Sequence, residues 1–315
     1  MIVMISQKWK KRLLILVTVL FAHCVVSLVA TKFICDGIFR RYEGTVTVPA
    51  ELTEMVAQRQ SHTFPSGEND LAGYLYESSA PGDLSALIIL APGFHAGADD
   101  YLWQIRELTD RGWAVFAYDA TGSCHSEGES TVGFPQSTLD LEAALKYVEK
   151  CQNFGYNKIV LLGHSQGGYA VGCALDGSRP IAAAVTVSGV NSAMEGVMGN
   201  ARSYVGPLAY GNYGFLWLYQ AFRFGPRRVG LDAAKTISQS STPVLVIHGY
   251  DDPQVPADRD SIFSHRERVS SADASFLLWE EPGSQGHTDL LFDPDGTANN
   301  ELMDTIHSFL LEKIK

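Results

Sequence analysis

The sequence has few cysteines, and the five that it contains show neither an even framework nor the close spacing of metal ligands. They are Cys24, Cys35, Cys124, Cys151 and Cys173. We therefore predict buried or free thiols, with no disulfide framework, no metal and no cofactor. Internal repeats, low-complexity tracts and phosphate-cradling glycine loops are also lacking. What remains is an ordinary globular composition in 315 residues, 46% hydrophobic and 19% charged, which suffices for one large α/β domain.

Basic residues are scarce beyond the N-terminal segment. Residues 1–41 hold seven of the 24 Lys and Arg but only one of the 35 Asp and Glu, which leaves 17 basic against 34 acidic residues in the remainder. A body so acidic would repel phosphate backbones, and this argues against nucleic acid as a partner.

The N-terminal segment contains a long apolar run, "LLILVTVLFAHCVVSLVATKFI", over residues 13–34. Its length matches the ~20 residues that a spanning helix needs, and a basic cluster at residues 8–12 precedes it. The positive-inside rule then places the N-terminus in the cytoplasm and everything after about residue 40 outside. The alternative is a cleaved signal peptide, which would leave a secreted protein. We thus expect a segment and anchor at 1–41, a connector at 42–60 and a globular domain at 61–315.

The globular part alternates apolar runs with amphipathic ones. Strands are expected at 62–64 and 71–77, joined by a turn at 66–69, and then at 86–90, 113–118 and 159–162, in "IAAAVTVSGV", at 244–248 and in "ASFLLWE". Helices are expected at 99–111, 137–150 and 299–313. Continuous apolar strands between helices indicate a mostly parallel central sheet flanked by helices.

One stretch, "KIVLLGHSQGGYAVGCAL", predicts a strand, a sharp turn and a helix rich in small residues. Its centre, Gly163-His164-Ser165-Gln166-Gly167, has the G-x-S-x-G spacing of a nucleophile elbow, in which the turn exposes the Ser165 hydroxyl. The backbone N–H of Gln166 would lie at the helix N-terminus and stabilise an oxyanion. The same pattern also occurs in ordinary turns, so the elbow depends on the elements around it.

Further candidates follow later strands in the order that this chemistry requires. The turn "APGFHAG" follows the third strand, where the N–H of Phe94 would complete an oxyanion hole and His95 would contact substrate. "IHGYDDPQVP" follows a late strand and offers Asp252 as the acid, with Asp251 the less favoured neighbour. "GHTD" offers His287 as the base. A base takes the serine proton and an acid orients the base.

Between residues 191 and 240 the alternation stops, and the segment is rich in aromatic residues. We interpret residues 192–240 as a helical cap inserted after the sixth strand. The rings of Tyr204, Tyr213 and Trp217 are expected to line a substrate pocket. The alternative is that such rings only pack the cap against the body.

Residues 61–315 resemble the α/β-hydrolase superfamily through "APGFHAG", "YDATGS", "GHSQGGYA", "IHGYDDPQVP" and "GHTD". Within it they are similar to bacterial membrane-anchored or exported serine hydrolases related to monoacylglycerol lipases, lysophospholipases and serine aminopeptidases. The resemblance implies the α/β-hydrolase fold and a serine hydrolase with a catalytic triad of Ser165, Asp252 and His287. The expected substrate is a small or lipid-like carboxylic ester with an apolar acyl or bulky group, cleaved through an acyl-enzyme.

Three other functions remain open at this stage. A peptidase of the aminopeptidase kind would need an acidic partner for the substrate's amino group, and Glu195 and Asp232 are the acids of the insert. An acyltransferase would use the same acyl-enzyme with another acceptor. A membrane-tethered binding protein with a dead site is the alternative outside catalysis, although such proteins usually lose part of the triad.

Overall fold

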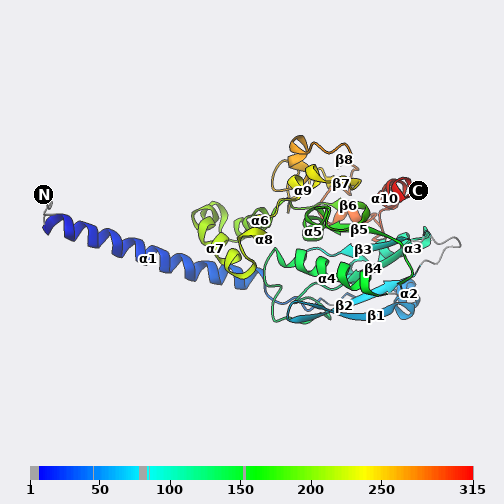
Figure 1. Ribbon diagram of the computed structural model, residues 1–315, viewed down its shortest axis with the longest axis horizontal. Coiled ribbons are helices and arrows are strands. Elements are labelled where there is room, and N and C mark those ends of the chain that lie inside the picture. The colour runs from blue at the N-terminus through cyan, green and yellow to red at the C-terminus, as the bar shows by residue number, and fades with distance from the viewer. Residues whose placement is uncertain (1–6, 45, 78–83, 85, 152–153, 315) are drawn as a thin grey trace.

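The computed structural model describes residues 7–44, 46–77, 84, 86–151 and 154–314 (Figure 1). Its centre is an eight-stranded sheet in the order β1-β2-β4-β3-β5-β6-β7-β8. Strand β2 runs antiparallel to both of its neighbours, β1 and β4, and β3 to β8 are parallel. The strands are β1 Gln60–Ser66, β2 Asn69–Tyr76, β3 Ala86–Ala91, β4 Ala114–Tyr118, β5 Lys158–His164, β6 Ile181–Val187, β7 Val244–Gly249 and β8 Ala274–Trp279.

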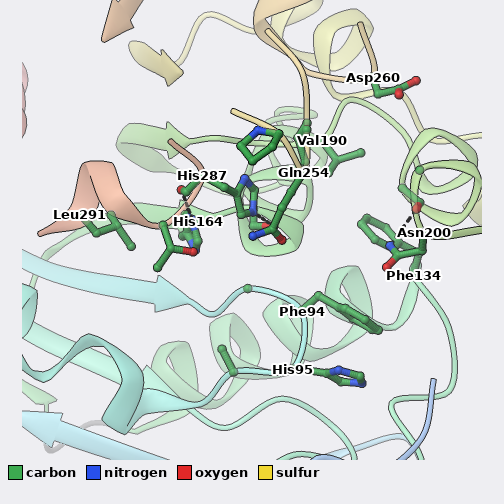
Figure 2. Close-up of a pocket in the computed structure, with 18 of the residues that line it drawn as sticks. Phe94, His95, Phe134, His164, Val190, Asn200, Gln254, Asp260, His287 and Leu291 are labelled. Atoms are coloured by element: carbon green, nitrogen blue, oxygen red, sulfur yellow. Dashed lines mark hydrogen bonds between the residues drawn. The ribbon is translucent and has the colours of Figure 1, made fainter. Parts of the chain in front are cut away.

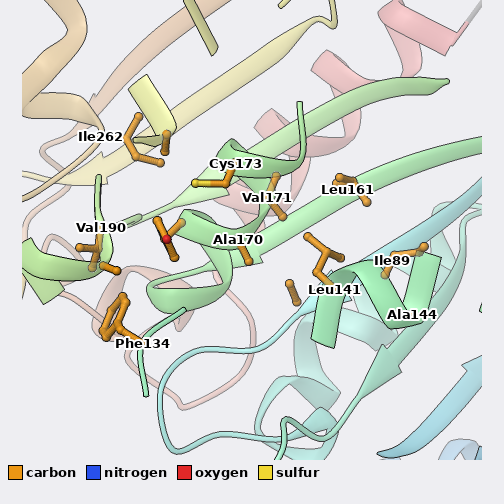
Figure 3. Packing of buried hydrophobic residues seen from close by; sticks show 14 of the residues in the cluster. Ile89, Phe134, Leu141, Ala144, Leu161, Ala170, Val171, Cys173, Val190 and Ile262 are labelled. Atoms are coloured by element: carbon orange, nitrogen blue, oxygen red, sulfur yellow. The ribbon is translucent and has the colours of Figure 1, made fainter. Parts of the chain in front are cut away.

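Both faces of the sheet are covered by helices, which is why the central strands are continuously apolar. Every residue of β3 and β4 is buried. Alternate side chains belong to separate cores: Ile89 packs toward one face and Ile88 toward the other. The first face carries α4 Gln136–Lys150, α5 Gln166–Ala174 and α9 Ala233–Gln239, and the second carries α3 Leu102–Asp110 and α10 Asn300–Ile314. Figure 3 shows Leu141 and Ala144 of α4 near Ile89.

A helical insert separates β6 from β7, as the sequence predicts. It consists of α6 Ala193–Val205, the 3₁₀ helix η4 Gly206–Asn212, α7 Tyr213–Phe224, the single turn α8 Pro226–Val229, and α9. The remaining helical elements are short: α2 Thr53–Gln58 and the 3₁₀ turns η1 Ala50–Leu52, η2 Ala98–Tyr101, η5 Phe263–Arg268 and η6 Asp289–Leu291. The expected fold class, a mostly parallel sheet with a helical insert after the sixth strand, is therefore confirmed.

The first helix, α1 Gln7–Ile38, projects from the body on the side of the insert (Figure 1). It is the one helix among the described residues that is long and apolar enough to cross a membrane, a test that a signal sequence near the N-terminus would also pass. Its buried residues, Ser27, Thr31, Cys35 and Ile38, form one stripe near its C-terminal end. There the side-chain amide of Asn212 donates to the Thr31 hydroxyl at 2.7 Å. The insert therefore covers the last turns of α1.

The chain that leaves α1 is bonded tightly to the body. The Arg41 guanidinium donates to the backbone carbonyls of Cys124, Ser126 and Gly128 at 2.8–3.0 Å. Tyr42 exchanges backbone hydrogen bonds with the same loop, accepting from the Cys124 N–H and donating to the Gly122 carbonyl. The first residues of the expected connector thus belong to the surface of the hydrolase-like body.

Candidate active site

Ser165 occupies a strained turn between β5 and α5. Its φ of 56° and ψ of −116° lie in a region that residues with side chains rarely adopt. The flanking glycines permit the turn, because a Cβ at Gly163 would lie 2.4 Å from the Gly167 carbonyl oxygen and one at Gly167 would lie 2.1 Å from that of Ala91. The strand–turn–helix expected from the G-x-S-x-G spacing is present, with the serine at its apex.

The structure brings together three residues that the sequence suggested as a triad. The Nε2 atom of His287 lies 2.9 Å from the Ser165 Oγ, and its Nδ1 lies 2.6 Å from Asp252 Oδ2. All three side chains are buried. Ser165 follows β5, Asp252 follows β7 and His287 follows β8, so the carboxyl ends of three parallel strands place them at one edge of the sheet.

Asp252, and not its neighbour Asp251, faces the histidine. Burial opposes ionisation of Asp252, but the hydrogen bond with His287 and the backbone N–H of Val255 outweigh it and hold the pKa of the carboxyl below its ordinary value. Asp252 Oδ1 also accepts from the Gln254 N–H at 2.9 Å. Asp251 is exposed and contributes its backbone N–H to the Gln285 carbonyl. The turn after β7 therefore fixes Asp252 as an ionised partner of His287.

A buried hydrogen-bond chain that we did not predict links the three loops of the site. The backbone N–H of Gly93 donates to the Tyr101 hydroxyl oxygen at 2.9 Å, and that hydroxyl lies 3.0 Å from His164 Nδ1. His164 Nε2 lies 3.0 Å from the backbone carbonyl of His287. Burial, and next the neighbouring His287, lower the pKa of His164 to about 3, so its ring is neutral near pH 7.

The partners of His164 determine where its single proton lies. A carbonyl oxygen only accepts, so Nε2 carries the proton and Nδ1 accepts from Tyr101. The glycine turn, the serine elbow and the histidine loop are thus joined by directed hydrogen bonds. Sequence gave no signal for Tyr101 beyond its place near the start of a helix.

Two backbone N–H groups, those of Gln166 and Phe94, are the candidate oxyanion donors. Gln166 is the first residue of α5, where backbone N–H groups have no partner within the helix. In the Pro92-Gly93-Phe94 turn, the N–H of Gly93 is already bonded to Tyr101, so Phe94 is the better donor of the two. Phe94 and Ser165 both line the same cavity.

That cavity has a volume of about 570 Å³, a size typical of small-molecule sites. Figure 2 shows Phe94 and His95 on the side opposite Gln254 and Asp260. His95 lines the cavity as expected, stacked on Phe94 with ring centroids 4.0 Å apart. The other apolar walls come from Phe134, Val190, Leu291 and Phe292, and the polar ones from Glu195, Asn200, Ser203, Gln254 and Asp260.

Three aromatic residues that we expected in the pocket lie elsewhere. Tyr204, Tyr213 and Trp217 are not among the described residues that line the cavity. Tyr204 is 67% exposed and Tyr213 45% exposed, while Trp217 packs against the body's core. The insert turns α6 toward the cavity instead, through Gly196, Gly199, Asn200 and Ser203. These small and polar residues recur at helical spacing, a signal that the abundance of rings obscured.

Glu195 lines the cavity, but its carboxylate is fully engaged. It accepts from the Ser192 hydroxyl at 2.7 Å and from the Asn191 amide at 3.1 Å, and its other oxygen lies 2.9 Å from His265 Nε2. Burial opposes its ionisation, but these hydrogen bonds, His265 first, hold its pKa below the ordinary value. With Ser192 as N-cap, Glu195 forms the start of α6.

Comparisons with known proteins agree with this architecture. A family model described as "Serine aminopeptidase, S33" matches residues 82–205. No curated protein matches the sequence significantly. Among solved structures, the Pf2001 esterase of Pyrococcus furiosus is 17% identical with a TM-score of 0.65, covering 88% of this chain and 99% of its own.

Two further solved structures show the breadth of the resemblance. Est1E of Butyrivibrio proteoclasticus, solved with ferulic acid, is 19% identical with a TM-score of 0.61 and covers 80% of this chain and 99% of its own. Proline iminopeptidase of Mycobacterium smegmatis is 16% identical with a TM-score of 0.53 and covers 81% and 99%. Such distant likeness concerns the fold. The resemblance indicated by the sequence motifs is confirmed at that level, and the chain has the α/β-hydrolase fold.

Proposed function

We propose that this protein is a serine hydrolase that cleaves carboxylic esters through an acyl-enzyme. The observation that carries the proposal is the hydrogen-bonded chain from Ser165 through His287 to Asp252, in which Ser165 and His287 line a cavity. The esterase name of one structural neighbour, Pf2001, agrees with it. A non-catalytic binding protein would not need a serine in a strained turn that faces a histidine base with an ionised carboxylate partner.

The chemistry follows from the geometry. Ser165 Oγ attacks the ester carbonyl carbon while His287 Nε2 takes the hydroxyl proton, and Asp252 stabilises the imidazolium. The N–H groups of Phe94 and Gln166 stabilise the oxyanion. When the tetrahedral adduct collapses, the C–O bond to the leaving alcohol breaks and His287 returns the proton to that oxygen. Water, deprotonated by His287, then attacks the acyl-enzyme and releases the carboxylic acid and free Ser165.

The cavity favours esters of moderate size. Phe94, Phe134 and Val190 give its walls apolar area beside Ser165, so a bulky or medium-length acyl group would be desolvated on binding. Each CH₂ buried contributes roughly 0.8 kcal/mol, so kcat/KM should rise by up to about fourfold per carbon until the cavity is full. Transfer of the acyl group to an alcohol in place of water would use the same intermediate.

A peptidase function is the second candidate, because the matching family model and the proline iminopeptidase carry peptidase names. Of the two acids that the sequence suggested for a substrate's ammonium group, Asp232 caps the start of α9, and the one that lines the cavity is Glu195. Its hydrogen bonds to Ser192, Asn191 and His265 leave it committed to the start of α6. We therefore rank aminoacyl amides below esters as substrates.

We also propose that α1 anchors the protein, with the body outside the cytoplasm. The helix is apolar over the length of a bilayer, and its basic N-terminal flank outweighs its C-terminal one. The buried stripe from Ser27 to Ile38 favours retention over cleavage, since removal of α1 would uncover Asn212 and the core beside Phe39.

Labelling with a fluorophosphonate tests the mechanism directly. We expect the full-length protein to be labelled and to hydrolyse a p-nitrophenyl butyrate ester, and Ser165→Ala to lose both properties. The matched control is Ser308→Ala on the exposed side of α10, which should keep both. Esterase activity that survives in Ser165→Ala would refute the proposal. Aminoacyl amides cleaved faster than every ester would replace it by the peptidase function.

A further inference from the structure

The insert carries exposed apolar side chains that neither the cavity nor the core uses. Phe222 is 94% exposed and Leu208 is 81% exposed, both on elements beside α1. Outside α1 and the insert, Tyr250 is the one exposed large hydrophobic side chain among the described residues. We call the following set the apolar crown: Tyr204, Val205, Leu208, Tyr210, Tyr213, Leu218 and Phe222. A patch of this kind on a soluble surface marks an interaction site.

The position of the insert along α1 indicates how deep the crown would lie in a bilayer that α1 spans. Asn212 meets α1 at Thr31, close to Lys32 at the end of the apolar run. Phe215, in the first turn of α7, meets the His23 ring edge-on with centroids 6.1 Å apart. His23 precedes Thr31 by eight residues, about 12 Å along the axis. Because half of a hydrocarbon core is about 15 Å, this contact lies within the leaflet nearer the body if α1 spans the bilayer.

The charge of this region also fits a lipid surface. From Gly196 to Leu231 the sequence contains four arginines, Arg202, Arg223, Arg227 and Arg228, and no acidic residue. The chain as a whole has a net charge of −11. Arg202 and Arg228 form ion pairs with Asp260 and Glu142, whereas Arg223 and Arg227, both exposed, follow Phe222 in the sequence. Aromatic rings mixed with arginines are typical of segments that lie in the headgroup region, where anionic lipids attract the basic side chains.

The globular domain is held in a fixed orientation relative to α1. The stripe on α1 packs on the insert, and Arg41 fixes the chain after α1 to three backbone carbonyls of the body. The orientation of α1 therefore sets the orientation of the crown. If α1 crosses the bilayer, the crown beside it is therefore held against the same bilayer.

We propose that the apolar crown is embedded in the outer leaflet of the same bilayer that α1 crosses, so that the cavity opens at the membrane surface. The proposal rests on the anchoring proposed above and adds a second membrane contact. Helix α6 links the two sites: Gly199, Asn200 and Ser203 line the cavity, and the next residue, Tyr204, begins the crown. On the opposite wall, Phe94 packs edge-on against Phe39, just after α1 ends, with centroids 5.9 Å apart. Esters dissolved in the leaflet would reach Ser165 without crossing water.

Depth-dependent quenching tests the contact. Phe222→Trp in the full-length protein, reconstituted into phosphatidylcholine vesicles with and without phosphatidylglycerol, should be quenched by lipids brominated in the upper acyl chain. The reference is Phe309→Trp on α10, which lies across the body from α1 (Figure 1), with the parent protein giving the background of native tryptophans. We expect quenching beyond background only for Phe222→Trp, and stronger quenching with phosphatidylglycerol.

Activity on two kinds of substrate tests the consequence. Leu208→Asp with Phe222→Asp removes two apolar contacts and adds two charges, so the rate on a vesicle-borne ester should fall about tenfold. The rate on a soluble short-chain ester should change by less than about twofold, because neither residue lines the cavity. Ser308→Asp, exposed on α10, adds one negative charge away from the crown and should change neither rate.

The outcomes separate the crown from the anchor and from the chemistry. The soluble-ester rate of Ser165→Ala tests the catalytic mechanism alone. Release of the parent protein from membranes by alkaline carbonate would contradict the anchor. A protein that resists carbonate but shows no quenching at position 222 would overturn the crown's embedding. Energy transfer between two labelled chains, together with no quenching at position 222, would show that the crown contacts a second copy of the protein and not lipid. Equal losses on both esters would overturn its role in substrate delivery.

Discussion

Replacing Asp252 by asparagine removes one charge and leaves the shape of the turn intact. The Oδ1 atom would still accept from the N–H groups of Gln254 and Val255, at 2.9 and 2.8 Å in the parent. The amide NH₂ group would then occupy the position of Oδ2, which lies 2.6 Å from His287 Nδ1. An NH₂ group donates, so Nδ1 would have to accept.

That exchange reverses the histidine's tautomer. With Nδ1 unprotonated, the neutral ring carries its proton on Nε2, which faces Ser165 Oγ at 2.9 Å. The ring could then neither take the serine proton nor gain from a carboxylate when it becomes charged. Loss of a triad acid by this route lowers kcat by about 10⁴-fold, equivalent to roughly 5.5 kcal/mol of transition-state stabilisation.

Burst and steady-state hydrolysis of p-nitrophenyl butyrate measure the loss. The matched control is Asp251→Asn, because Asp251 is exposed and contributes only its backbone N–H nearby. Its kcat should stay within about twofold of the parent, and both variants should unfold at the same urea concentration within error. A larger loss in Asp251→Asn than in Asp252→Asn would refute the assigned roles.

Two predictions concern the buried chain behind the triad. The pKa of His164 is about 3 in the folded protein and near its ordinary value of 6.5 in the unfolded chain. Between these values only the unfolded chain binds the proton. The free energy of unfolding should therefore fall as the pH drops from about 6.5 towards 3, by up to about 1.4 kcal/mol per pH unit. Urea titrations in detergent at several pH values should show a shallower fall for His164→Gln, and an unchanged slope would contradict this account. Tyr101→Phe deprives the Gly93 N–H and His164 Nδ1 of their partner, so it should cost about 1–3 kcal/mol of stability per unpaired group and lower kcat more than it changes KM. A variant as stable and active as the parent would show that the hydroxyl has no positioning role.

The sheet and the places of Ser165, Asp252 and His287 at its edge were predictable because their signals are local. Continuous apolar runs such as residues 86–90 need burial on both faces, and the Gly163 to Gly167 spacing prescribes a turn that only glycines allow. The loop after each strand then supplies one chemical group. What the spacing could not give was the chain from Gly93 through Tyr101 to His164, whose members meet only after the sheet has formed.

The insert was harder to interpret because the chemistry of an aromatic side chain does not indicate which environment surrounds it. Aromatic side chains suit a pocket wall, a core or a membrane interface equally well. Tyr204 and Tyr213 face outward while the small residues of α6 face the cavity, and only the direction of each helix separates these cases. Likewise, nothing local to Arg41 indicates that its guanidinium would bind three carbonyls about 85 residues further along the chain.

The three hydrogen bonds of Arg41 leave no flexible linker between α1 and the globular domain. An enzyme on a long flexible linker searches a hemisphere of solution, with a volume that grows as the cube of the linker's reach. If α1 spans the bilayer as proposed above, this protein is instead confined to a layer against the membrane and moves only as α1 diffuses laterally. For a lipid-dissolved ester, its turnover should follow the mole fraction of substrate in the membrane and be insensitive to dilution of the vesicles. Catalysis of this kind is a surface reaction, with lateral encounter in place of bulk collision.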